Sequence, residues 1–178
     1  MPDEQRPGGF GRMGDEAVVL ETAFTSVDMR CVVCQAVWET PVVRIVNVST
    51  HPDARLGILL KTMHRTHCPV CRQERDVDAI FDYYDPERRL LVQVRPVWEL
   101  MAGGGEDWYW ARYEDLVLKY AAIDVRVDVV FGFDAMIEKY LGGQDAVEAA
   151  RRERSVLQSE RSGGRRPSHL PSEEEDWE

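Results

Sequence analysis

Two Cys-x-x-Cys motifs, Cys31-Val32-Val33-Cys34 and Cys68-Pro69-Val70-Cys71, decide the fold of this chain and contain all of its cysteines. Zn²⁺ is satisfied by four thiolates in a tetrahedron, at about 2.3 Å from each sulfur. A structural zinc ion of this kind can contribute on the order of 10 kcal/mol to the folding of a small domain. The sequence therefore predicts a closed structural zinc site with the ligands Cys31, Cys34, Cys68 and Cys71.

The sequence leaves other roles open for these cysteines. A redox dithiol normally sits at the start of a helix, whereas Cys34 is followed by Gln35 and a strand-like run. Catalytic zinc needs an open coordination position, and His64 and His67 beside the second motif are alternative ligands. No His-Glu-x-x-His motif is present. Metal-free motifs are a further alternative, because neither is followed by the glycine that often completes such turns.

Bulk composition describes an acidic globular chain. It has 178 residues and a formal net charge of −10, which opposes non-specific binding to nucleic-acid phosphates. The first residues are acidic, and the first apolar run, Ala17 to Leu20, is too short for a signal peptide or a membrane span. We therefore expect a cytoplasmic protein without a membrane segment. In that reducing compartment, paired cysteine motifs favour metal over disulfides.

Hydrophobic periodicity predicts elements along the whole chain. Between the two cysteine motifs we expect a strand and a short helix. After them we expect a hairpin, an aromatic helix, another strand, a short helix capped by Asp134, and a charged helix. The corresponding ranges are 40–48, 56–63, 76–84 with 90–94, 109–120, 123–131, 134–142 and 145–160. The carboxylates of the hairpin region, Asp76, Asp78, Asp82 and Asp85, are interpreted as a solvated face.

These elements predict an α+β fold in which a zinc ribbon supports a small antiparallel β-sheet with flanking helices. The expected domain spans residues 25–160. Residues 1–24 are interpreted as a flexible tail, and residues 161–178 as a disordered acidic tail that ends in Glu-Glu-Glu-Asp-Trp-Glu.

Two groups of residues are candidate contact surfaces. Aromatic side chains are frequent interface anchors, so the dense aromatic segment and the tryptophan of the acidic tail are candidates for binding a partner protein, although core packing also explains the segment. They are Trp108, Tyr109, Trp110, Tyr113 and Trp177. The arginines at 151, 152 and 154 could contact nucleic acid, but the neighbouring glutamates dilute their charge.

The order of motifs resembles the bacterial CpXC family. The matching pieces are the two cysteine motifs, the segments Ile45–Val48 and Pro52–Leu60 between them, and Tyr83–Leu91 after them. The segment 126–139 is also similar to the C-terminal part of that family. The first motif lacks the family's proline, and the aromatic segment 108–113 has no counterpart. The resemblance implies a zinc-ribbon-like domain of uncharacterised function with four cysteine ligands and no catalytic residue.

Taken together, the sequence predicts a non-enzymatic, zinc-binding adaptor of the bacterial cytoplasm that binds another protein. A homo-oligomer is possible. The first alternative is a nucleic-acid-associated or transcription-regulatory zinc ribbon. The second is a thiol oxidoreductase that uses its Cys-x-x-Cys motifs.

Overall fold

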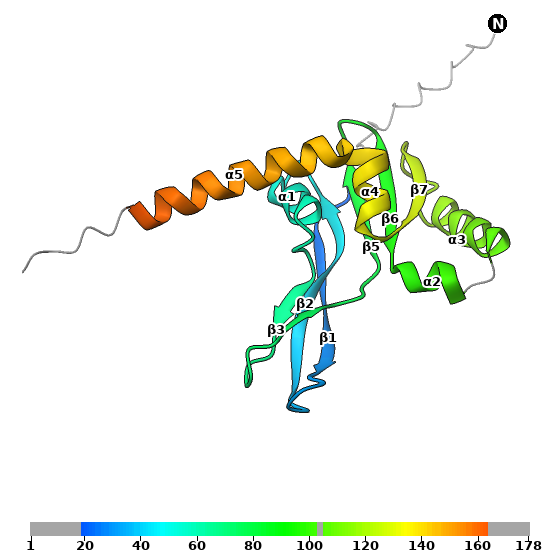
Figure 1. Ribbon diagram of the computed structural model, residues 1–178. Coiled ribbons are helices and arrows are strands. Elements are labelled where there is room, and N and C mark those ends of the chain that lie inside the picture. Colours follow the sequence, from blue (N-terminus) through cyan, green and yellow to red (C-terminus); the bar gives the residue numbers. More distant parts are fainter. Residues whose placement is uncertain (1–18, 103–104, 164–178) are drawn as a thin grey trace, which may run out of the picture.

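A computed structural model describes residues 19–102 and 105–163 (Figure 1). Its centre is a five-stranded sheet in the order β1-β2-β5-β6-β7. The strands are β1 (Ala23–Arg30), β2 (Val37–Asn47), β5 (Phe81–Asp85), β6 (Leu90–Arg95) and β7 (Arg126–Phe131). The pairs β1–β2 and β5–β6 are antiparallel, whereas β2–β5 and β6–β7 are parallel. The α+β class is confirmed, but the expected antiparallel sheet is a mixed one.

The two cysteine motifs lie at the ends of two hairpins. The long hairpin β1–β2 leaves the sheet as a two-stranded ribbon with Cys31–Cys34 in its turn. The short strands β3 (Arg65–His67) and β4 (Glu74–Asp76) pair with each other around Cys68–Cys71. Figure 1 shows both hairpins projecting side by side from the body of the molecule. The fold thereby brings together two motifs that are far apart in the sequence.

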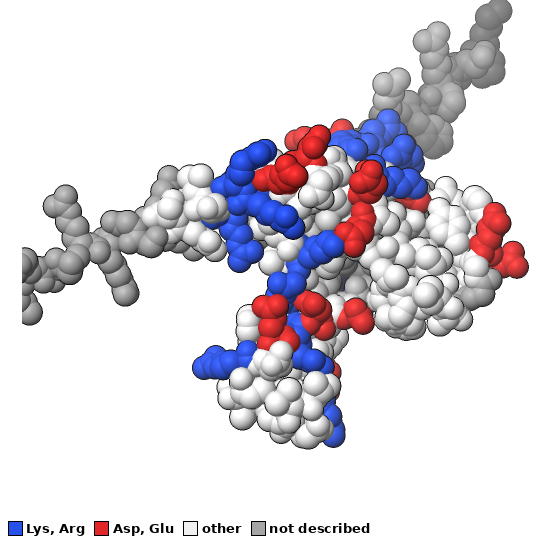
Figure 2. Space-filling view, in the orientation of Figure 1, with Lys and Arg blue, Asp and Glu red and all other residues white. Residues whose placement is uncertain are grey.

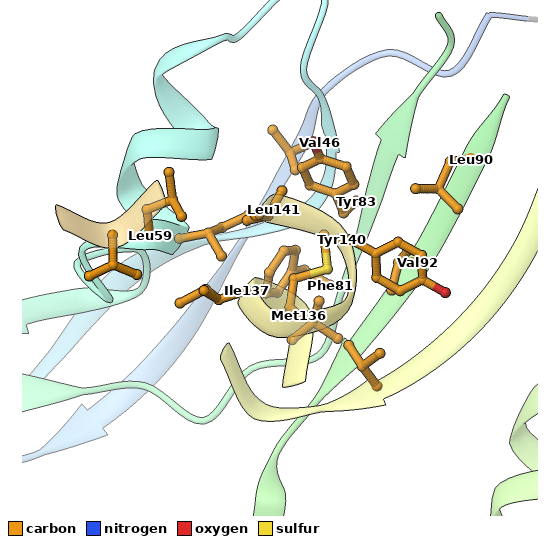
Figure 3. Close-up of a cluster of buried hydrophobic side chains, with 14 of the residues drawn as sticks. Val46, Leu59, Phe81, Tyr83, Leu90, Val92, Met136, Ile137, Tyr140 and Leu141 are labelled. Atoms are coloured by element: carbon orange, nitrogen blue, oxygen red, sulfur yellow. The ribbon is translucent and has the colours of Figure 1, made fainter. Parts of the chain in front are cut away.

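One face of the sheet is covered by α1 (Asp53–Leu59), α4 (Gly132–Met136), the π-helix η1 (Ile137–Leu141) and the start of α5 (Gly143–Gly163). Figure 3 shows side chains from these elements converging on the central strands. Among them, Phe81, Tyr83 and Met136 are almost completely buried. Burial of apolar surface contributes about 25 cal/mol per Å², so this cluster stabilises the packing of the helices on the sheet.

The opposite face is covered by α3 (Glu106–Lys119), which follows the short helix α2 (Val97–Ala102). Leu116 and Tyr120 pack there against Tyr84, Leu91 and Val129 of the sheet. The central strands are therefore buried on both faces, and every residue of β5 is buried. This two-sided burial contradicts the interpretation of Asp82 and Asp85 as solvated, since both are buried.

Most predicted elements exist, with shifted ends. The strand predicted over 76–84 is divided, because residues up to Asp76 belong to β4 and the central strand begins only at Phe81. Asp134 was expected to cap a helix but lies inside α4, whose first turn is preceded by Phe131. The reason is the tight turn at Gly132, which has a φ of +79° and starts the helix directly after β7.

The ordered elements extend slightly past the predicted domain bounds. Strand β1 begins at Ala23, inside the predicted tail 1–24, and α5 runs to Gly163. The remainder of the acidic tail, with Trp177, lies outside the described residues. Within the described ranges, no helix is both long and apolar enough to cross a membrane.

Candidate metal centre

The four cysteines form one compact cluster. Cys31 Sγ lies 3.5 Å from Cys71 Sγ, and Cys34 Sγ lies 3.5 Å from Cys68 Sγ. All four sulfurs lie within 4.8 Å of one another, and no pair forms a disulfide. Four sulfurs at about 2.3 Å from a central ion would be roughly 3.8 Å apart, so the spacing fits a tetrahedral metal.

Both turns have the same backbone geometry. The amide of Gln35 donates to the Cys31 carbonyl, and the amide of Arg72 donates in the same way to the Cys68 carbonyl. The residue after each motif has a left-handed backbone conformation, with φ of 60° at Gln35 and 61° at Arg72. Glycine adopts this conformation at the lowest cost, which explains why it is common after such motifs. Here two longer side chains occupy the position while the turn is retained.

The pKa values of the four thiols are shifted in opposite directions. A hydrogen bond from the Cys34 backbone amide is the main reason that the pKa of the Cys31 thiol falls to about 6. The Cys71 amide lowers the pKa of Cys68 in the same way. At Cys71 the Gln73 amide also lowers the pKa, but desolvation and the neighbouring sulfurs outweigh it and raise the pKa to about 12. Four sulfurs at this distance can all be thiolates only when a cation balances their charge.

Neither histidine beside the second motif belongs to the cluster. The Nε2 atom of His64 accepts a hydrogen bond of 3.0 Å from the Val43 amide, and its ring packs edge-on against Phe81. Burial lowers the pKa of this imidazole. His67 lies 3.6 Å from a Glu74 carboxylate oxygen. In the described ranges, the four cysteines are the only cluster of three or more His, Cys, Asp or Glu side chains that could hold a metal ion.

Most of the predicted aromatic contact segment is engaged within the fold. Trp108 packs against Phe131 and lies under the guanidinium groups of Arg95 and Arg112. Tyr109 stacks on Tyr113 and donates a 3.0 Å hydrogen bond to Asp128. Among the four residues of the segment, Trp110 remains the most exposed.

The larger exposed apolar area was not found from the sequence, because it lies on the short helix α2. Exposed fractions are 56% for Trp98 and 85% for Met101, with Val97 and Leu100 also exposed. Together with Trp110, these residues define the α2–α3 surface. Figure 2 shows the side of the molecule formed by these two helices as largely free of charged side chains. The Val-Trp-Glu-Leu-Met run 97–101 was the available signal.

Two Lys-Tyr pairs with similar roles were also missed. Lys119 and Tyr120 donate hydrogen bonds of 2.7 and 2.5 Å to the buried carboxylate of Asp82. Lys139 and Tyr140 donate in the same way to Asp128. Each pair ties the end of a helical segment to a strand of the sheet. The buried carboxylates are thus structural groups with their partners in place.

The basic residues predicted as a nucleic-acid contact lie on α5. Helix α5 packs on the body through its first turns, where Val147 and Ala150 are buried. Residues 151–159 are all exposed, including the arginines at 151, 152 and 154. Figure 1 shows this part of the helix extending away from the body, and Figure 2 shows positive charge gathered around it.

Comparison with known proteins gives one match. The family model described as CpXC protein matches residues 29–141, which include both cysteine motifs and most of the sheet. No curated protein and no solved structure matches the chain.

Proposed function

This chain belongs to the CpXC family. We propose that it is a non-enzymatic module, stabilised by zinc, that binds another protein through its α2–α3 surface. The observation that carries the proposal is the exposure of Trp98, Met101 and Trp110 on two helices that follow each other in the chain. Large exposed apolar patches on a protein surface often mark interaction sites. Tryptophan and methionine are also enriched at such interfaces.

Zinc is the metal that best suits the four-cysteine site. Soft thiolate ligands in a tetrahedron favour zinc over oxygen-preferring cations such as Mg²⁺ or Ca²⁺. With the ion bound, the two cysteine hairpins would constitute a zinc ribbon. The ion would hold β3–β4 against β1–β2 and neutralise charge on the thiolates. Four sulfurs leave no open position for a substrate, which supports a structural role.

Photo-crosslinking inside the native cell tests the interaction surface. A photoreactive phenylalanine analogue at Met101 should trap one defined protein, while the same analogue at the exposed Glu87 in the β5–β6 turn should not. Replacement of Trp98 by Ser should remove the crosslink from position 101. Equal crosslinking at positions 101 and 87, or none at either, would contradict the proposed surface.

Nucleic-acid binding is the second candidate, supported by the exposed arginines of α5. Under that alternative, charge reversal at positions 151, 152 and 154 would abolish retention on nucleic acid, and crosslinking at Met101 would be unaffected.

Thiol alkylation distinguishes a structural zinc site from the thiol oxidoreductase alternative. Zinc-bound thiolates should resist alkylation until a chelator is added, whereas a redox dithiol should react at once.

A further inference from the structure

A cavity beside the α2–α3 surface has the character of a binding pocket. It has a volume of about 330 Å³ and lies between the β3–β4 hairpin, the sheet and helices α2 and α4. Its apolar wall is made by Met63, Phe81, Val94, Trp98 and Phe133, among others. Mostly apolar pockets of this size with few polar groups are typical ligand sites. The volume is enough for one large side chain.

The cations at the cavity disfavour an anionic occupant, and a cationic one would offer no acceptor to the His64 donor described below. Every cation in its lining has a partner in the described chain. Lys61 pairs with Asp134 at 2.5 Å, Arg65 with Asp76 at 3.0 Å, and Arg95 with Glu99 at 2.6 Å. An anionic ligand would have to compete for these cations with carboxylates already in place.

His64 supplies one unused donor. Because its Nε2 atom accepts from the Val43 amide, the neutral ring carries its proton on Nδ1. That Nδ1–H group has no hydrogen-bond partner in the described ranges, and His64 lines the cavity. The backbone of His64 is held at a φ of 62°, a conformation uncommon for a residue other than glycine. An occupant with a hydrogen-bond acceptor would satisfy this donor.

The cavity wall is continuous with the exposed surface of α2. Val97 and Trp98 contribute to both. Close approach of α2 to the start of α4 requires Gly132, because a Cβ atom there would lie 2.5 Å from Val97 Cγ2. A partner that covers α2 would therefore reach the cavity mouth.

From this geometry we infer that the cavity is the anchor pocket for a neutral aromatic side chain of the partner protein, a tyrosine whose hydroxyl oxygen accepts from His64 Nδ1–H. The inference rests on the proposed protein-binding function and adds the chemistry of the partner. Aromatic residues buried in central pockets contribute a large share of interface binding free energy.

The test is NMR titration of the full-length chain with N-acetyl-tyrosinamide. Amide shifts should concentrate at His64, Ala79 and Phe133. N-acetyl-phenylalaninamide, which lacks the acceptor, should bind about five-fold more weakly, the equivalent of one hydrogen bond. N-acetyl-alaninamide should cause no localised shift. The Ala79→Trp variant, which fills the cavity, should lose binding, while Ala121→Trp at an exposed position should bind like the unchanged chain.

Two results would overturn the inference. One is the absence of localised shifts with either aromatic probe, and the other is binding that survives in Ala79→Trp. If crosslinking at Met101 still captures a partner in either case, the interaction module stands and only the anchor pocket fails. If both experiments fail, the proposed function fails with it.

Discussion

At the scale of single residues, backbone conformation at the cysteine turns has measurable consequences. Gln35 and Arg72 adopt left-handed conformations that cost an ordinary residue about 1–2 kcal/mol. Glycine would relieve this strain, but it also gives the unfolded chain more conformational entropy. We therefore expect Gln35→Gly to leave the free energy of unfolding unchanged or to raise it by up to about 1 kcal/mol.

In contrast, Gln35→Val should destabilise the turn by more than about 1 kcal/mol, because a β-branched residue is strained at positive φ. Urea unfolding of the metal-loaded proteins measures both changes. If valine is tolerated as well as glycine, the left-handed turn does not exist in solution.

The buried carboxylate of Asp128 makes a second prediction at this scale. It accepts hydrogen bonds from Tyr109, the Val129 amide, Lys139 and Tyr140. We expect Asp128→Asn to destabilise the fold by about 2–4 kcal/mol at pH 7. The reason is that these hydrogen-bond donors are arranged around a negative charge, which the amide side chain lacks. Asp124→Asn is the control, since this exposed carboxylate pairs with Arg89 and should contribute less than about 1 kcal/mol. Equal effects of the two substitutions would contradict a buried network.

Asp128 also predicts a pH dependence. Burial alone would raise its pKa, but the hydrogen bonds from Lys139, Tyr140, Val129 and Tyr109 outweigh burial and lower it. The unfolded chain, with its ordinary carboxyl pKa, then binds the proton more readily than the folded chain. Stability from Asp128 is therefore complete above about pH 4 and is lost as the pH falls through the lower folded pKa. Unfolding free energies from pH 6 to pH 2 should show a smaller decline in Asp128→Asn than in the unchanged chain.

At the scale of elements, the β3–β4 hairpin depends on the metal more than the main sheet does. Its two strands have three residues each, and isolated hairpins are marginally stable in water. Among the described residues, two side-chain hydrogen bonds also connect this region to β2, one between Thr40 and Thr66 and one from the Val43 amide to His64, which precedes β3. The main sheet has two apolar cores of its own.

Chelation should therefore abolish hydrogen-exchange protection at Thr66 and His67 before it affects β5 and β6. Cys68→Ser should give the same pattern, with β3 unprotected while β5 and β6 keep their protection. Simultaneous loss of protection in β3 and β5 would show that the metal and the main sheet unfold as one unit.

Helix α5 has two parts with different energetic roles. Val147 and Ala150 belong to the core, whereas residues 151–159 are exposed. Truncation after residue 155 should leave the melting temperature nearly unchanged. Val147→Ala, by comparison, should cost roughly 1–3 kcal/mol through lost burial. A large drop on truncation would show that the distal part of the chain docks on the body.

Sequence reasoning located what depends on neighbours in the chain. Helix α3, the β5–β6 hairpin and the cysteine motifs were predicted because each has a local period or spacing. The parallel pairing of β2 with β5 was not, since Ile45 and Asp82 are distant in sequence. The burial of Asp82 was missed for the same reason. Its partners, Lys119 and Tyr120, come from a different helix, and alternation in a strand does not reveal them.

At the scale of the whole molecule, the chain combines a rigid sheet, a pair of cysteine hairpins and an exposed apolar helix. The β3–β4 hairpin closes one wall of the cavity next to α2, because Arg65 and Asp76 of this hairpin and the adjacent His64 line the cavity. The cysteine cluster and the proposed interaction surface are thus connected through the fold. Loss of the metal should weaken partner binding by disordering that wall, and this effect can be measured with the Met101 crosslink after chelation.

Native mass spectrometry of the protein purified from its own cells without chelator tests the four-cysteine zinc site. We expect a chain that carries one zinc ion, with all four cysteines protected from alkylation until the ion is removed. A metal-free chain with four reactive thiols, or one with a disulfide within a Cys-x-x-Cys motif, would contradict it.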